Sequence, residues 1–305
     1  MIIKRLFWGV ASICCLSFMT GCSGCSSSET SDSDFEIPDS LKNAPLQLSE
    51  NVVQDMIQNI SSPVEMANQI KKSGAGFSQQ ILNSPDNIKN YNTSFKRALN
   101  LGVYSADLGY INTFNKNTVV VSYLLAVKEL AEGVNVGQFL DFTTLKRLAT
   151  NSTNLDSLKQ LSVSSFNKMD LYLREQNRSN VSTAIVAGAW LEGIYITCVV
   201  IEQTNDQDLI YRLGEQKDIV NILLIILNNF SRADNNFAAL VAEIQKIKDC
   251  YDGVKITTEF GEPTTKEVDG MLVIEQNEIS HVEITPEQVT AIIEKIKAAR
   301  QFIVG

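Results

Sequence analysis

Two acidic residues lie among apolar and aromatic neighbours, where a carboxylate is unusual. Asp107 falls within residues 102–110, and Glu192 falls within the similar stretch 188–195. Burial and a nearby like charge both raise the pKa of a carboxyl group, and two facing carboxyl groups are the minimum equipment for glycoside cleavage. One hypothesis is therefore that Asp107 and Glu192 converge in a pocket as an acid/base pair or a ligand clamp.

The same spacing supports a structural role for these acids. Tyr104 and Tyr110 lie three residues before and after Asp107, and Tyr195 lies three residues after Glu192. In a helix this spacing puts each tyrosine on the same face as its acid. Each carboxylate would then be satisfied between helices by a tyrosine hydroxyl or a backbone amide. No spacing here is diagnostic of catalysis, so we favour the structural role.

A third residue whose side chain could take part in chemistry is Cys22. Lys4 and Arg5 precede an apolar run over residues 6–19, and Thr20-Gly21 precedes the cysteine. This order is typical of a bacterial lipoprotein signal peptide, here residues 1–21, and the run is too short for a stable transmembrane helix. We expect Cys22 to be acylated, by palmitate among other chains, and to attach the protein to the lipid bilayer. The alternative is an ordinary secretory signal.

Residues 22–47 form a Ser- and acid-rich segment, which predicts a flexible tether. A Ser-plus-acid run soon after a lipidated cysteine resembles the surface-export signal of Bacteroidota-type lipoproteins. With residues 103–110 and 188–195, it makes the chain similar to mainly helical envelope lipoproteins of that group. The resemblance implies an outer-membrane location, periplasmic or surface-exposed. Asp39-Ser40-Leu41 is similar to the O-glycosylation motif of these proteins, which makes Ser40 a candidate and Ser157 a weaker one.

Composition excludes several classes of function. The chain has one histidine, His281, so multi-His zinc sites, bis-His haem and His-carboxylate iron sites are excluded, and we expect no metal or cofactor. We expect His281 to be an exposed strand residue. The formal net charge is −9, and removal of residues 1–21 would take it to −11. Such an acidic chain is repelled by phosphate, so nucleic acid is not an expected partner.

Helical periodicity covers most of the mature chain, and we assign residues 48–253 to a helical domain. An amphipathic helix begins near Ser49, and Ser62-Pro63-Val64-Glu65 is a capping box that opens a second. Further helices are expected over 93–114, 117–132, 143–149, 154–178, 181–202, 206–230 and 234–252. Cys198 and Cys250 belong to this domain, and a disulfide between them is the less favoured outcome.

Residues 254–305 have a different texture. Apolar and polar residues alternate after Gly253, and Asp269-Gly270 marks a turn, which predicts a small antiparallel β-meander. Thr285-Pro286-Glu287-Gln288 then begins a closing helix. Two or three strands are only marginally stable by themselves, and we therefore expect them to pack on the helices. The predicted fold is mainly α, an antiparallel helical bundle or helix-pair array with this meander and closing helix.

Residues 181–202 are apolar almost all round. A transmembrane span is one interpretation, but Glu192 lies near the middle, so the centre of a bundle is favoured, with Gly188 and Gly193 allowing close helix packing. No stretch specifies a reaction. The expected function is a non-enzymatic binding or scaffolding module whose partner is an envelope protein or a glycan. The alternatives are an envelope- or glycan-directed hydrolase using Asp107 and Glu192, and a binding accessory of an uptake system.

Overall fold

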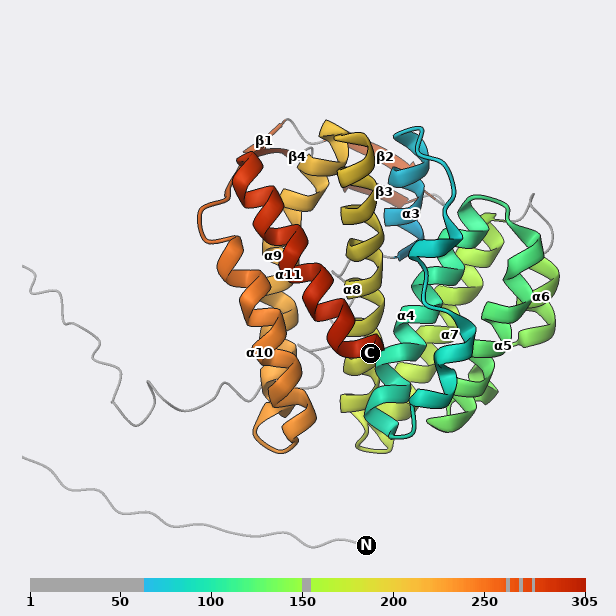
Figure 1. Cartoon of the computed structure of the whole chain (residues 1–305). Coiled ribbons are helices and arrows are strands. Elements are labelled where there is room, and N and C mark those ends of the chain that lie inside the picture. The colour runs from blue at the N-terminus through green and yellow to red at the C-terminus, as the bar shows by residue number, and fades with distance from the viewer. Residues whose placement is uncertain (1–62, 150–154, 262–263, 269–270, 276–277) are drawn as a thin grey trace, which may run out of the picture. The chain divides into compact units, whose positions relative to one another are not determined.

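Helices dominate the computed structural model (Figure 1), which describes residues 63–149, 155–261, 264–268, 271–275 and 278–305. These residues belong to one compact unit, Pro45–Gly305. The α-helices are α3 (Pro63–Lys72), α4 (Ser94–Thr113), α5 (Asn117–Gly133), α6 (Phe142–Ala149), α7 (Leu155–Glu175), α8 (Ser179–Thr204), α9 (Gln207–Ser231), α10 (Asn235–Cys250) and α11 (Pro286–Val304). Short 3-10 helices are η1 (Gln79–Ile81), η2 (Pro85–Asn90) and η3 (Gly137–Phe139). The mainly α fold class is confirmed.

Some of the predictions lie outside the described residues. These are the signal peptide, the acylated Cys22, the tether with Ser40, and the helix expected from Ser49. Ser157, the weaker glycosylation candidate, lies in the first turn of α7.

Side-chain caps fix where several helices begin. The hydroxyl of Thr93 accepts from the backbone N–H of Lys96 before α4, and Asp206 accepts from Leu209 before α9. Thr285 forms a full capping box before α11, and its partner is Gln288. Each cap satisfies N–H groups that the first helical turn leaves without partners, so the predicted starts agree closely with the structure.

Asparagine, rather than glycine, follows several helices in the left-handed conformation. Asn115, Asn135, Asn177 and Asn205 have φ values of 55°, 59°, 54° and 49°. They come directly or almost directly after α4, α5, α7 and α8. The helix expected over residues 117–132 continues to Gly133, its last helical residue, and Asn135 makes the reversal. Asparagine tolerates this region because its short polar side chain bonds locally.

Helix α8 is the centre of the bundle. It packs against α3, α4, α7, α9 and α11, and its most extensive contact is with α4 (Figure 1). It is the one described helix that is long and apolar enough to cross a membrane, yet 78% of that apolar window is buried within the protein. The prediction that this apolar segment is a central helix is confirmed.

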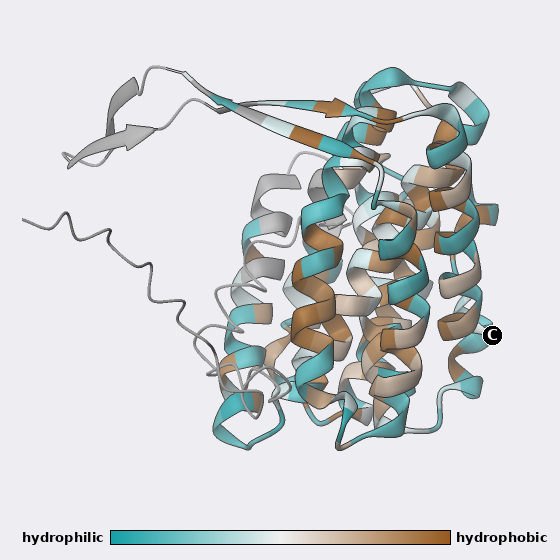
Figure 2. Ribbon diagram, turned by 90° about the vertical axis from the view of Figure 1, so that its left-hand side faces the viewer, coloured by the Kyte–Doolittle hydropathy of each residue, from teal (hydrophilic) through white to brown (hydrophobic). Residues whose placement is uncertain are grey.

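A ribbon made of two successive two-stranded sheets precedes α11. Its strands are β1 (Lys255–Phe260), β2 (Thr264–Val268), β3 (Met271–Glu275) and β4 (Glu278–Glu283). β1 pairs with β4 and β2 pairs with β3, both antiparallel, so the pairing is nested, whereas a meander pairs each strand with the next. β1 and β4 extend from one end of the helices (Figure 2).

The base of this ribbon is held by α9. The hydroxyl of Tyr211 donates to the carbonyl of Ser280, and Nζ of Lys217 donates to the carbonyl of Val254 over 2.6 Å. Val282 packs against Gly214, where any side chain would overlap it. The expectation that the strands pack on a helix is therefore confirmed for β4, which contacts α9.

Candidate functional site: a buried carboxylate pair and its arginine

Two glycines bring α4 and α8 together about one helical turn before the two acids. A Cβ built on Gly188 would overlap the backbone carbonyl of Leu99, and one built on Gly102 would overlap that of Ile185. The backbones therefore approach as closely as only glycine permits. The predicted role of Gly188 in close packing is confirmed, and Gly102 provides the matching surface.

The structure brings Asp107 and Glu192 together in the core. Both side chains have 0% exposure, and the two carboxyl groups lie within hydrogen-bonding reach of each other. Oδ2 of Asp107 accepts from the backbone N–H of Asn83 over 3.1 Å. Oδ1 of Asp107 is buried and receives no hydrogen bond from a protein donor. The convergence that the catalytic hypothesis requires is thus present.

Arg300 of α11 completes the cluster. Its Nε donates to Oε2 of Glu192 and its Nη2 donates to Oε1, each over 3.0 Å. The guanidinium carbon lies 4.5 Å from the ring centroid of Tyr195, a cation–π contact. This fork is the geometry in which arginine binds a carboxylate most strongly.

Burial and neighbouring charges have different effects on the pKa values of Asp107 and Arg300. Desolvation, followed by the charge of Glu192, raises the pKa of Asp107 well above its usual range, although Arg300 acts in the opposite direction. Burial opposes the charge of Arg300, but the attraction of Glu192 outweighs it and raises the pKa of the guanidinium. Arg300 therefore stays charged, and Asp107 is the group pushed toward its neutral form.

The tyrosines that share a face with the acids have other partners. The hydroxyl of Tyr104 donates to the carbonyl of Ser84 over 2.6 Å, and that of Tyr110 accepts from the backbone N–H of Ser78 over 3.1 Å. Tyr195 stacks on Arg300. Among the described residues no hydrogen bond joins one of these tyrosine hydroxyls to either acid, because the hydroxyls of Tyr104 and Tyr110 bond loop backbone and the ring of Tyr195 packs on Arg300. The backbone-amide alternative is correct for Asp107.

The two carboxyl groups of the cluster are closed to solvent by the described residues. A cavity of about 130 Å³ lies between α3, α8 and α9, lined in part by Gln69, Thr197 and Gln216. A shallow hollow is lined by Phe77, Ser78, Gln79 and Gln80. Neither is lined by Asp107 or Glu192. The two carboxyl groups therefore meet as a catalytic pair would, but neither of these two hollows reaches them.

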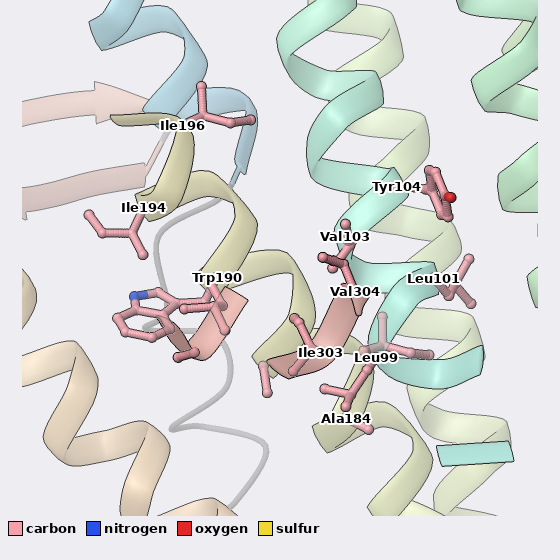
Figure 3. Packing of buried hydrophobic residues seen from close by; sticks show 14 of the residues in the cluster. Leu99, Leu101, Val103, Tyr104, Ala184, Trp190, Ile194, Ile196, Ile303 and Val304 are labelled. Carbon is pink, nitrogen blue, oxygen red and sulfur yellow. The ribbon is translucent and has the colours of Figure 1, made fainter. Parts of the chain in front are cut away.

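The last turn of α11 is held beside this cluster. Nδ2 of Asn100 donates to the carbonyl of Ile303 over 3.0 Å, and the hydroxyl of Tyr91 donates to that of Val304 over 3.2 Å. Figure 3 shows Ile303 and Val304 close to Val103 and Leu99 of α4. Buried donors thus satisfy carbonyls that a helix end leaves without partners.

Sequence reasoning missed Arg300, although a signal for it exists. The apolar stripe of the closing helix includes Ile296 and Ile303, and position 300 falls between them at helical spacing. An arginine on a buried stripe needs a buried acid. The two acids considered above were the available partners. Asn83, by contrast, contributes its backbone N–H, for which no side-chain pattern exists.

The remaining candidates have ordinary surroundings. His281 is exposed on β4, with Nε2 lying 3.8 Å from Oε2 of Glu259, so the expectation of an exposed strand histidine is confirmed. Cys198 is buried, Cys250 is half-buried, and both thiols are free. Among the residues that the structure describes, no group of three or more potential ligands could hold a metal ion.

Comparison of the chain with protein-family models, with curated proteins and with solved structures finds no match. The functional argument therefore rests on the residues and geometry described above.

Proposed function

We propose that this protein is a lipid-anchored lipoprotein of a bacterial cell envelope, attached to the bilayer through acylated Cys22. Its helical domain would be a non-enzymatic binding or scaffolding module with an envelope protein or a glycan as partner. Residues 19–22, which end the predicted signal peptide at its cysteine, and the acidic tether that follows support the anchor and an outer-membrane location.

The single observation that supports a non-enzymatic role is the burial of Asp107 and Glu192. A general acid or base must come within hydrogen-bonding reach of its substrate. These side chains are 0% exposed, and Arg300 forms a fork with Glu192. The most chemically suggestive groups of the described chain are therefore committed to joining helices. A scaffold requires such a fixed core, with recognition left to the surface.

The central position of α8 supports attachment by lipid. A helix with this composition is long enough to span a membrane, but α3, α4, α7, α9 and α11 already cover it. Extracting α8 would expose the apolar faces of its neighbours to water. Among the described helices no other is long and apolar enough to cross a membrane, which is consistent with the proposed attachment through Cys22.

The competing proposal is an envelope- or glycan-directed hydrolase. The observation in its favour is that Asp107 and Glu192 meet. For a substrate to reach them, α11 would have to leave, taking Arg300 with it. Asp107→Asn and Glu192→Gln would then abolish glycan cleavage by the full chain. A cleavage activity lost in both variants while they remain folded would replace the scaffold proposal with this one.

The anchor is tested by replacing Cys22 with serine in the full-length protein expressed in its bacterial envelope. We expect metabolic palmitate labelling and membrane retention to be lost, and globomycin to block maturation of the wild type. Cys25→Ser is the matched control, because Cys25 lies three residues on in the same polar segment. Equal labelling of wild type and Cys22→Ser would overturn the anchor. Protease treatment of intact cells distinguishes surface exposure from a periplasmic location.

A further inference from the structure

The buried cluster has one more acid than base. Asp107 and Glu192 face one guanidinium, that of Arg300, and both acids are fully buried. If both were ionised, the core would hold an uncompensated negative charge, which costs far more than a neutral acid in the same place.

The hydrogen bonds of the cluster identify where a proton is missing. Both oxygens of Glu192 accept from Arg300, and Oδ2 of Asp107 accepts from Asn83. Oδ1 of Asp107 is the buried oxygen without a protein donor, and the neighbouring group within reach is the carboxylate of Glu192. Two carboxylate oxygens repel each other, whereas a protonated and an ionised carboxyl group form a strong hydrogen bond.

We propose that Asp107 is held as a neutral carboxylic acid whose proton it shares with Glu192, so that one proton and one guanidinium fasten α4, α8 and α11 together. The closing helix is then attached to the core by a link that depends on pH.

The tyrosines and the arginine that face Asp107 do not change their protonation state under the conditions where Asp107 does. Tyr104 of α4 and Tyr123 of α5 are buried, and desolvation raises the pKa of each. Desolvation also raises the pKa of Tyr91 and of Tyr195, so these phenols stay neutral. Arg300, from α11, stays charged. Of the described groups around the cluster for which a pKa shift is resolved, the carboxyl group of Asp107 is therefore the one that titrates between acidic and neutral pH.

The direction of the pH effect follows from linkage. The unfolded chain releases the proton of Asp107 near the ordinary value of 3.8, whereas the pKa of Asp107 in the folded protein lies well above it. The stability that the proton confers is complete below the unfolded pKa. It declines as pH rises and is lost once pH passes the folded pKa. In that window the unfolding equilibrium constant rises about tenfold per pH unit relative to a protein without the linkage.

Asp107→Asn in the full chain tests this proposal. An asparagine keeps the acceptor for Asn83 and offers an N–H to Glu192 in place of the shared proton, but it cannot titrate. We expect the wild-type unfolding equilibrium constant, divided by that of Asp107→Asn, to rise about tenfold per pH unit between about pH 5 and the folded pKa. Glu202→Gln is the matched control, because it removes an exposed acid from the same helix as Glu192 and leaves the slope of the wild type. A flat ratio would overturn the proposal.

Infrared spectroscopy of the folded protein gives a second measurement that needs no unfolding. The wild type at neutral pH should show the carbonyl stretch of a protonated carboxyl group, and Asp107→Asn should lack it. Glu202→Gln should retain the band. Absence of the band from the wild type would show that both acids are ionised, which contradicts the proposal even if Asp107→Asn fails to fold.

Discussion

Two ion pairs join the same two helices and differ in their surroundings. Arg300 and Glu192 meet through paired bonds of 3.0 Å, with side chains that are 13% and 0% exposed. Lys297 reaches both oxygens of Glu202 over 2.5 and 2.6 Å, with side chains that are 41% and 43% exposed. Each pair links α11 to α8. Distance alone would rank the exposed pair first.

Removing one residue of the pair should nevertheless cost more stability at the buried pair than at the exposed one. Water solvates an exposed charge that has lost its partner, and salt screens the pair, so exposed pairs contribute about 0–1 kcal/mol. A buried charge left alone has no such compensation, although the intact pair adds little net stability over apolar residues. The buried pair therefore specifies where α11 docks, while the exposed pair adds little.

The substitution Arg300→Met gives the largest effect expected to distinguish the buried pair from the exposed one. It leaves Glu192 and Asp107 without their cation, and we expect a loss of about 3–5 kcal/mol in the free energy of unfolding. Chemical denaturation of the full chain at neutral pH measures it. Lys297→Met is the matched control, one turn earlier on the same helix. Arg300→Lys should lie between the two, because lysine keeps the charge but loses the fork. A smaller loss for Arg300→Met than for Lys297→Met would refute the distinction.

The next largest effect comes from separating the two helices that carry the acids. In Gly188→Ala the new methyl group would overlap the carbonyl of Leu99, so α4 and α8 must move apart. Overpacking of this kind costs about 1–3 kcal/mol. It should also weaken the dependence of stability on pH, because Asp107 would move away from Glu192.

Gly76→Ala is the control for that experiment, since a Cβ there would meet nothing within 4 Å. It should unfold like the wild type. If Gly188→Ala were as stable as Gly76→Ala, the close approach of the helices would not be what positions the acids.

The helices were predictable because the signals that define them are local. The caps at Thr93 and Thr285 lie next to the turns they stabilise, and the apolar stripes repeat within each helix. Strand pairing was less accessible, because alternation marks a strand without naming its partner. The nested pairing of β1 with β4 follows from how the ribbon folds back, which no single stretch encodes.

The candidate site was predictable only in part. Asp107 and Glu192 stand out as acids in apolar helices, but their meeting depends on the crossing of α4 and α8, set by Gly102 and Gly188. Arg300 lies over a hundred residues further along, and its stripe says that it is buried without saying against which acid. Long-range pairing of this kind is a property of packing.

The smallest effect belongs to the exposed pair and calibrates the others. In a double-mutant cycle with Lys297→Met and Glu202→Gln, the interaction energy should be about 0–1 kcal/mol and should shrink as salt is added. These two residues join α8 to α11, the same two helices that the buried pair joins, so the two pairs can be compared directly. An interaction energy as large as the loss in Arg300→Met would mean that an ion pair stabilises the docking of α11 equally well whether it is buried or exposed. A small, salt-sensitive interaction energy would support burial as the cause of the difference between the two pairs. The neutral state of Asp107 has the same cause.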